Sequence, residues 1–397
     1  MQVPAVHSNN DIPAFGASVR TAFALERDYA HLNHGSYGAT PVSVLAAQRI
    51  WQDRLEREPS RFMDREFRPG LRSAAAALAL HIGADDDGIA MVENATGAVN
   101  AVLRGLDLAP GSEILVTDQT YPAVRNTADY VAARCGAKVR ALSLPFPVSD
   151  PDEILTRFKA ALAPVPALVI LDHVTSPTAL VLPVAEMAKA AREAGALVLI
   201  DGAHAPGMLA LDISMLDCDW YTGNCHKWMF AAKGCAFLWT APEHRANTHP
   251  LVISHGYSDS YIDEFDWVGT RDASAQFSLP SALSFMDAYG PENIRRHNTD
   301  LANQAADLLT AAWNTERGAG QALTGSMATI RLPEGLGDSQ RDADALRADL
   351  VDHDRMQIPI RYMAGHLWCR VSAQIYNSIS EYESLAQSIT RRAADRS

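Results

Sequence analysis

Two polar positions near the middle of the 397-residue chain have the types and surroundings that chemistry needs. Asp201 ends an apolar run at 196–200 and is followed by a glycine, and Lys227 stands between small or polar residues at 223–226 and a bulky apolar run at 228–230. An apolar run that ends in an acid and a glycine predicts a buried parallel strand whose carboxyl end opens into a site. A lysine among such neighbours is expected to be partly buried, and burial lowers the pKa of its amine and makes it a better nucleophile.

An acid at a strand end and a partly buried lysine are the pair that pyridoxal phosphate chemistry requires. The amine forms a Schiff base with the cofactor, and the carboxylate keeps the pyridine nitrogen protonated. Two unit charges about 4 Å apart at an effective dielectric of about 20 interact by roughly 4 kcal/mol, or about 3 pKa units, which is enough to hold the ring cationic at neutral pH. The alternatives are a helix cap for Asp201 and a solvated surface position for Lys227.

Other polar residues near predicted strand ends extend this site. Asn94, Ala95 and Thr96 join a strand to a helix, where free N–H groups and a hydroxyl can cradle a phosphate, although any helix N-cap looks similar. Tyr121 follows a strand and a turn, and is either an aromatic plate stacked on the pyridine ring or an ordinary packed tyrosine. Ser176 follows the run at 168–171 and is either a site residue or a strand-end polar group with local partners.

Arg370 lies inside an apolar strand pattern at 367–372. A buried arginine needs an anion, and a planar guanidinium suits the carboxylate of a substrate. An internal ion pair is the alternative.

Composition excludes several classes of function. The net charge is −13, from 47 acids against 34 bases without a basic stripe, so nucleic acid is not an expected partner. No apolar stretch is long enough for a membrane span, and the first thirty residues lack the apolar region of a secretory signal. The five cysteines are scattered and odd in number, which favours a reducing cytoplasm over a disulfide framework. Cys218, Cys225 and Cys235 lack paired CxxC spacing, so we expect no metal.

Strand and helix patterns alternate over most of the chain. We therefore expect an α/β fold, with a mainly parallel sheet covered on both faces. The pattern changes near residue 290, which predicts an N-terminal arm at 1–30, a large α/β domain at 31–290 and a smaller α+β domain at 291–397. The expected strands of the large domain are 89–92, 113–117, 139–144, 168–172, 197–201 and 235–240.

These segments together resemble the class V aminotransferase family of fold-type I pyridoxal phosphate enzymes, and within it isopenicillin N epimerase and its homologues. The resemblance covers nearly the whole chain in order and implies the fold of the type I transferases. It rests on Asp-Gly-Ala-His-Ala-Pro-Gly at 201–207, Asn-Cys-His-Lys-Trp at 224–228, and the segments 32–38, 94–96, 173–176, 269–272 and 370–372.

The resemblance assigns a role to each candidate residue. It makes Lys227 the Schiff-base lysine and Asp201 the partner of the ring nitrogen. It makes Arg370 the ligand of the substrate's α-carboxylate, with Asn33 and His34 also expected at the substrate. The remaining cofactor contacts are His204 and Ser176 near the ring hydroxyl, Tyr121 stacked on the ring, and Ala95, Thr96, Asn224 and His226 around the phosphate. Thr270 is expected to reach the phosphate of a neighbouring subunit, which implies a homodimer with shared sites.

The expected reaction begins with removal of the Cα proton of an amino acid or an amino-acid conjugate by Lys227. Return of a proton to the opposite face, from Tyr121 or His34, gives an epimerase, which is the favoured outcome. Loss of a sulfur from Cβ gives a C–S lyase, because lyases of cysteine conjugates carry similar segments at 224–228, 254–256 and 269–270. Transamination is a third outcome. Persulfide chemistry is disfavoured, since Cys369 adjoins Arg370 with no loop between them.

Overall fold

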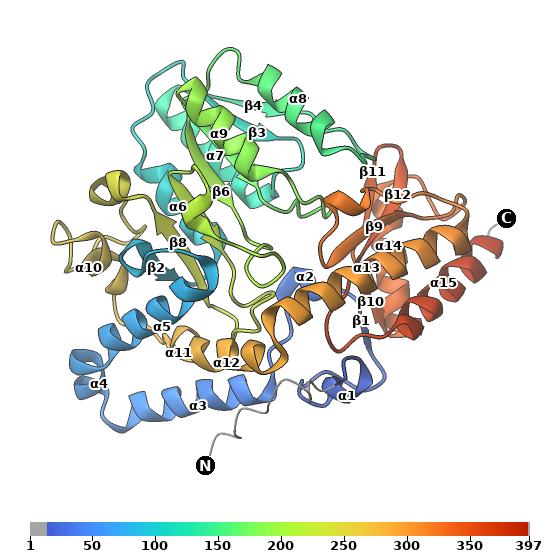
Figure 1. Ribbon diagram of the computed structural model, residues 1–397, viewed down its shortest axis with the longest axis horizontal. Coiled ribbons are helices and arrows are strands. Elements are labelled where there is room, and N and C mark those ends of the chain that lie inside the picture. The colour runs from blue at the N-terminus through green and yellow to red at the C-terminus, as the bar shows by residue number, and fades with distance from the viewer. Residues whose placement is uncertain (1–13, 396–397) are drawn as a thin grey trace.

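The computed structural model describes residues 14–395, and its largest element is a seven-stranded sheet (Figure 1). The strand order is β2-β8-β7-β6-β5-β3-β4, with β4, β3, β5, β6 and β7 parallel and β8 antiparallel to both of its neighbours. The predicted α/β class with a mainly parallel sheet is confirmed. The strands are β2 (Ile89–Val92), β3 (Glu113–Thr117), β4 (Lys138–Leu142), β5 (Leu168–Asp172), β6 (Leu197–Asp201), β7 (Trp220–Gly223) and β8 (Ala236–Thr240).

Helices cover both faces of this sheet. Alternate residues of a strand point to opposite faces, so Val169 and Val198 pack into one apolar cluster and Ile170 and Leu199 into another. The helices before residue 290 are α1 (Ala17–Arg20), α2 (His34–Tyr37), α3 (Val42–Arg57), α4 (Pro59–Arg65), α5 (Phe67–Ile82), α6 (Ala95–Gly105), α7 (Pro122–Cys135), α8 (Pro151–Ala161), α9 (Val184–Ala194), α10 (Tyr261–Asp266), α11 (Ser274–Phe277) and α12 (Leu279–Tyr289). The cluster that contains Ile170 and Leu199 also holds residues of α6 and α7, whereas α5, α9 and α12 contribute to the other.

A second, smaller part follows and lies to the right in Figure 1. It has its own apolar cluster and a three-stranded sheet of order β11-β12-β9. Its elements are α13 (Pro291–Trp313), β9 (Met327–Arg331), α14 (Gln340–Asp354), β10 (Met356–Gln357), β11 (Ile360–Met363), β12 (His366–Ser372) and α15 (Ile379–Ala394). The predicted division at residue 290 falls at the start of α13. The N-terminal segment joins this part, because β1 (Ala30–His31) pairs with β10 and Leu32 packs in the same cluster.

Local signals in the sequence set the ends of several helices. Asn94 caps α6 by accepting the N–H of Gly97 at 2.8 Å. Gly136 ends α7 and Gly195 ends α9 in the left-handed conformation that glycine adopts without strain. Ser378 and Glu381 form a capping box at the start of α15.

The carboxyl ends of the parallel strands point toward the smaller part. The loops after β3, β5, β6 and β7 lie at this edge, which is where ligands bind in open α/β sheets. They carry Tyr121, Ser176, His204 and Lys227, and β12 brings Arg370 from the smaller part. None of the helices within residues 14–395 has the length and apolar character needed to cross a membrane.

Candidate active site

A cavity of about 460 Å³ opens at the carboxyl edge of the sheet, against the smaller part. Six of the residues expected at the site line it. They come from six separate loops or elements that are far apart in the sequence, and the fold brings them to one cavity. The six are Asn33, Tyr121, Ser176, His204, Lys227 and Arg370.

Lys227 lies in a tight turn after β7, and the backbone at Gly38 and Gly207 packs closely against this turn. A Cβ at Gly38 would collide with the carbonyl of His226, and one at Gly207 with the carbonyl of Trp228. Both glycines have positive φ, 71° for Gly38 and 84° for Gly207, which other residues rarely adopt. Burial, with the charge of Arg370 adding to it, lowers the pKa of the Lys227 amine to about 8.

His204 and Asp201 lie beside this amine. Lys227 Nζ donates to His204 Nε2 at 3.4 Å, and the other ring nitrogen of His204, Nδ1, is buried without a hydrogen-bond partner. Burial lowers the pKa of His204 well below its usual value. Asp201 ends β6, accepts the N–H of Ala203 at 3.0 Å and is 5% exposed. Burial raises the pKa of Asp201, while the Ala203 N–H and the nearby charge of Lys227 oppose that rise.

A second buried acid, Asp172, stands next to Asp201 and was missed by the sequence reasoning. It ends β5 in register with Asp201 on β6, so both side chains lie on the same face of the sheet. Its Oδ1 accepts the N–H of Tyr121 at 3.4 Å, and its Oδ2 is buried without a partner. Burial and the charge of Asp201 raise the pKa of Asp172 to about 8. The signal was present, since Leu-Val-Ile-Leu-Asp at 168–172 closely parallels Leu-Val-Leu-Ile-Asp at 197–201.

Arg370 is a buried cation that has no ion-pair partner within residues 14–395. Its guanidinium donates to the carbonyl of Ser176, to Asn33 Oδ1 at 3.3 Å and to Ser36 Oγ at 3.1 Å, while Nε is buried without a partner. Burial, with the charge of Arg361 adding to it, lowers the pKa of Arg370 to about 10. The internal ion pair considered from the sequence is therefore absent, and neutral oxygens hold the guanidinium at the cavity wall.

The expected phosphate residues gather at the start of α6, outside the lining of the cavity. Ala95 N–H donates to Asn224 Oδ1 at 2.9 Å, which ties α6 to the segment that leads to Lys227. Thr96 keeps its hydroxyl free of partners within the described chain. His226 Nδ1 donates to the carbonyl of Cys235 at 3.0 Å, and burial lowers the pKa of His226 to about 4. The helix N-terminus and the Thr96 hydroxyl together suit an anion.

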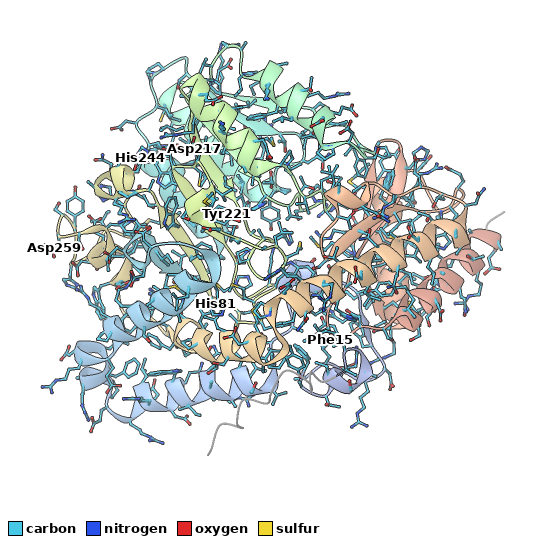
Figure 2. The ribbon with its side chains drawn as sticks, in the orientation of Figure 1. Phe15, His81, Asp217, Tyr221, His244 and Asp259 are labelled. Atoms are coloured by element: carbon cyan, nitrogen blue, oxygen red, sulfur yellow. The ribbon has the colours of Figure 1, made fainter. Side chains whose placement is uncertain are left out.

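Tyr121 and Ser176 lie on the cavity wall in different settings. The Tyr121 side chain is 42% exposed, and its N–H bond to Asp172 ties the loop after β3 to the end of β5. Ser176 lines the cavity and accepts a hydrogen bond from Arg370 through its carbonyl, while its hydroxyl has no hydrogen-bond partner within residues 14–395. His173 turns away to bond the hydroxyl of Tyr221 at 2.8 Å, and Figure 2 labels Tyr221 near the middle of the molecule.

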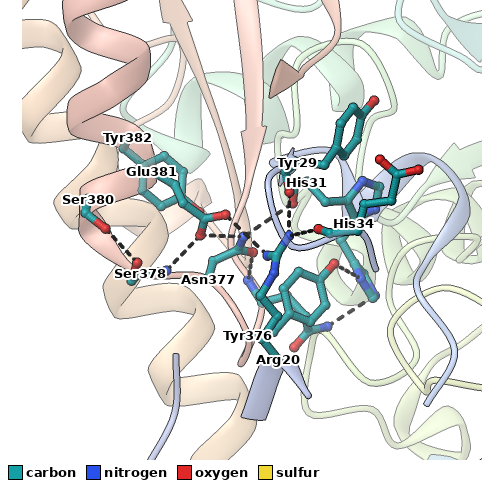
Figure 3. Close-up of polar contacts among 12 residues, drawn as sticks. Arg20, Tyr29, His31, His34, Tyr376, Asn377, Ser378, Ser380, Glu381 and Tyr382 are labelled. Carbon is teal, nitrogen blue, oxygen red and sulfur yellow. Dashed lines mark hydrogen bonds and ion pairs between the residues drawn. The ribbon is translucent and has the colours of Figure 1, made fainter. Parts of the chain in front are cut away.

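Two further expected site residues, His34 and Thr270, also lie outside the lining of the cavity. His34 is fully buried and does not line the cavity, in contrast to its expected contact with substrate. Both of its ring nitrogens have partners. One is the carbonyl of Lys227 at 2.9 Å, and the other is the hydroxyl of Tyr376 at 2.8 Å, whose bond to His34 is drawn in Figure 3. Thr270 is exposed in the loop between α10 and α11 and does not line the cavity of its own chain. That position leaves the expected role in a neighbouring subunit as a prediction.

The cavity continues into a second one of about 510 Å³. The two share Ser176, Pro177 and Arg361, and the outer one is bordered by Phe146 and Tyr362 among others. No local pattern in the sequence indicates this second cavity, because its wall is assembled from loops of both parts of the molecule.

A cluster of Asp219, Glu243 and His244 is the group within residues 14–395 whose potential metal ligands lie close together. Arg192 supplies a positive charge to this cluster, because it contacts Asp219 at 2.7 Å and Glu243 at 3.8 Å. His244 also contacts Asp219 at 2.6 Å. Figure 2 labels His244 close to Asp217 and away from the middle of the molecule. This cluster is a buried acid with its counter-charge, so no metal is needed to explain it.

The residues at the carboxyl edge fit pyridoxal phosphate. Lys227 offers an amine of lowered pKa, and Asp201 offers a buried carboxyl group at a strand end. The partnerless His204 Nδ1 and Asp172 Oδ2 are buried polar atoms of the kind that a bound polar ligand satisfies. The start of α6, with the Thr96 hydroxyl, suits the phosphate group.

Comparisons with known proteins agree with this geometry. The family profile "Aminotransferase class-V" matches residues 57–385. Isopenicillin N epimerase of Amycolatopsis lactamdurans is 33% identical over 94% of this chain and 97% of its own. A probable L-cysteine desulfhydrase, chloroplastic, of Arabidopsis thaliana is also 33% identical, over 93% of this chain and 84% of its own. Among solved structures, a cystine C–S lyase in complex with cysteine persulfide shares the fold with a TM-score of 0.78 at 24% identity, covering 92% of this chain and 98% of that one.

Proposed function

This chain belongs to the aminotransferase class-V family of pyridoxal phosphate enzymes, and from that premise we propose that it removes the Cα proton of an amino acid or an amino-acid conjugate. One observation carries the proposal. The amine of Lys227, with its pKa lowered to about 8, and the unpaired guanidinium of Arg370 line the same cavity. A proton acceptor and an anion site in one cavity are what an α-amino acid requires.

Each residue has a defined task in this proposal. Pyridoxal phosphate, when bound, withdraws electrons from Cα and makes its proton acidic. Lys227 would hold the cofactor and then take the proton, since an amine with a pKa near 8 is partly neutral at the working pH. Arg370 would bind the α-carboxylate through its free donor atoms. Asp201 would stabilise a positive charge on the ring nitrogen.

β-Elimination of a sulfur group is the outcome that this cavity supports best. It needs one base and a leaving group on Cβ, and Lys227 can return the proton that it removes to the departing sulfur. The overall reaction consumes water and a cysteine or cysteine conjugate, and it releases pyruvate, ammonia and either hydrogen sulfide, from cysteine, or a thiol, from a conjugate. Curated relatives named as L-cysteine desulfhydrases add support.

Epimerisation is the second candidate, and one residue favours it. A proton must then reach Cα from the face opposite Lys227, and the buried His34 is not available for this step. Tyr121 lines the cavity, and its hydroxyl has no hydrogen-bond partner among residues 14–395. Relatives named isopenicillin N epimerase are as similar to this chain as the desulfhydrases named above.

The proposal includes a homodimer in which Thr270 of each chain contacts the phosphate bound by the other. Its support is the exposed position of Thr270, outside the cavity of its own chain. A cytoplasmic location remains a prediction, since one relative carries "chloroplastic" in its name.

The deciding experiment incubates the holoenzyme in D₂O with L-cysteine, with a cysteine conjugate and with amino acids that lack a leaving group. Stoichiometric pyruvate and ammonia from the cysteine compounds alone support elimination. Change of chirality in recovered amino acid without pyruvate supports epimerisation. Absence of deuterium at Cα in every recovered substrate, together with absence of pyruvate, would refute proton removal altogether.

A further inference from the structure

His34 is a neutral histidine that is enclosed on all sides. The side chain is 0% exposed, and its ring lies 4.8 Å from that of Trp228 and 6.0 Å from that of Phe230, centroid to centroid. Burial holds its pKa well below the usual range, so the ring stays uncharged at working pH. A neutral imidazole has one N–H donor and one acceptor nitrogen, and each of them must find a partner when buried.

The partners of His34 fix which nitrogen carries the hydrogen. The carbonyl of Lys227 can only accept, so Nε2–H donates to it at 2.9 Å. Nδ1 is therefore the acceptor, and it receives the hydroxyl of Tyr376 at 2.8 Å and the N–H of Ala39 at 3.3 Å. Gln374 also borders the ring, but its amide nitrogen, 3.1 Å from Nε2, is itself a donor, so this contact is not a hydrogen bond when Nε2 carries the hydrogen. The ring thus bonds the backbone of the residue whose amine reaches the cavity.

Three segments that build the cavity meet at this ring. His34 begins α2, and its neighbours Asn33 and Ser36 accept hydrogen bonds from Arg370. Tyr376 lies in the loop that follows β12, the strand that carries Arg370. Figure 3 shows the Tyr376 bond to His34 within a larger polar cluster. His34 therefore connects the Lys227 turn to α2, whose residues bond the Arg370 guanidinium, and to the loop after β12, the strand that carries Arg370.

We propose that His34 is a positioning residue, whose Nε2–H bond to the Lys227 carbonyl holds the lysine amine in register with the carboxylate site at Arg370. The inference rests on the proposed function, in which Lys227 holds the cofactor and takes the proton. It replaces the substrate contact expected from the sequence. Its physical basis is that a displacement of about 1 Å at a reacting group can cost on the order of 100-fold in rate.

The expected kinetic effect separates positioning from binding. Arg370 keeps its bonds to Ser176, Asn33 and Ser36 when the His34 ring is changed, so KM for the amino acid should change little. The Lys227 turn loses the donor to its carbonyl, so kcat should fall. A residue that touched substrate would instead raise KM.

Four variants test this. His34→Phe keeps an aromatic ring in the pocket but removes the hydrogen bonds of both ring nitrogens, and His34→Gln restores an amide donor near the Nε2 position. Tyr376→Phe removes only the hydroxyl that orients the ring. His31→Phe is the matched control, because His31 is another largely buried histidine of the same cluster whose hydrogen-bond partner is Gln357 rather than Lys227.

The first readout does not depend on turnover. Cofactor-stripped protein is mixed with pyridoxal phosphate, and the visible band and the fraction fixed to Lys227 by borohydride are followed in time. We expect His34→Phe to slow attachment and to lower kcat by about 100-fold, with His34→Gln recovering most of both. Tyr376→Phe should fall between them, and His31→Phe should match the wild type in attachment and kcat even if its thermal stability falls.

Several outcomes would overturn the inference. Wild-type attachment and kcat in His34→Phe would do so, as would a raised KM with unchanged kcat. Equal losses in His34→Phe, His34→Gln and His31→Phe that follow the loss of thermal stability would reduce the residue to a structural role. A wild-type protein that binds no cofactor would refute the proposed function instead, and that control is run first.

Discussion

The exchange of Arg370 for lysine is the sharpest test of the substrate site. Lysine keeps the positive charge but loses the planar fork that can grip both oxygens of a carboxylate. One charge-assisted hydrogen bond contributes about 1.5–3 kcal/mol, and each 1.4 kcal/mol is a factor of about ten. Loss of one such bond therefore predicts a KM about 10- to 100-fold higher for amino acids. The cofactor band should be unchanged, because Arg370 lies in β12 and not among the predicted cofactor ligands.

The same residue makes an opposite prediction for stability. Burial lowers the pKa of Arg370 from 12.5 to about 10, and a pKa unit corresponds to about 1.4 kcal/mol. Keeping this charge buried without an anion thus costs the folded state on the order of 3 kcal/mol at neutral pH, partly offset by its three hydrogen-bonded contacts. Arg370→Met removes the charge at similar length, so the cofactor-free protein should unfold at an equal or higher temperature while losing carboxylate binding.

The assay measures initial rates against amino-acid concentration, the cofactor spectrum and thermal unfolding for both variants. Arg361→Gln is the control, since Arg361 is an exposed arginine near the same cavity. The reasoning is refuted if Arg370→Lys leaves KM unchanged. It is equally refuted if Arg370→Met strongly destabilises the fold, because the guanidinium would then serve the structure rather than a ligand.

Three further substitutions test the groups at the strand ends. In Lys227→Ala, borohydride should no longer fix the cofactor to the protein. A variant that still holds the cofactor through a reducible imine would exclude Lys227 from this role. Asp201→Ala should keep bound cofactor yet lose most exchange of the Cα proton in D₂O, and full exchange would exclude Asp201 from the mechanism. Asp172 has its pKa raised to about 8 from 3.8. Between pH 4 and 8 the Asp172 carboxyl is protonated in the folded protein but ionised in the unfolded chain. The stability of the cofactor-free protein therefore falls as the pH rises from about 4 to 8. Asp172→Asn should remove that fall, which amounts to a few kcal/mol at pH 8. If the free energy of unfolding depends on pH in the same way in the wild type and in the variant, the assignment is contradicted.

The sequence was a good guide wherever a chemical signal is local. The apolar runs that end in Asp172 and Asp201 are strands β5 and β6, and the acid–glycine pair at 201–202 marks the carboxyl edge. Lys227 and Arg370 could be selected because charged residues among apolar neighbours are costly unless used. Two features were missed. Strand β7, which has four residues, was not among the predicted strands, and Asp172 was not recognised as a site residue.

Long-range partners explain the remaining differences. His34 bonds residues 193 and 342 positions away, so its burial behind the Lys227 backbone could not be inferred from its neighbours in sequence. The start of α6 had a recognisable cap in Asn94, but the bond from Ala95 N–H to Asn224 requires knowledge of how α6 meets the loop after β7. Residue types near a strand end thus indicate which chemistry is available, and packing decides which atoms remain free to perform it.

The charge balance of the site explains why it suits an amino acid. Two buried cations, Lys227 and Arg370, face two buried carboxyl groups, and the raised pKa of Asp172 keeps that acid largely protonated below pH 8. The histidines at 34 and 204 are held neutral by burial. The protein groups alone therefore leave an excess of positive charge, which an anionic ligand such as a carboxylate offsets. In the proposed reaction, binding and proton removal would follow from this balance, whereas the fate of Cα would depend on whether the Tyr121 hydroxyl can return a proton before a sulfur departs.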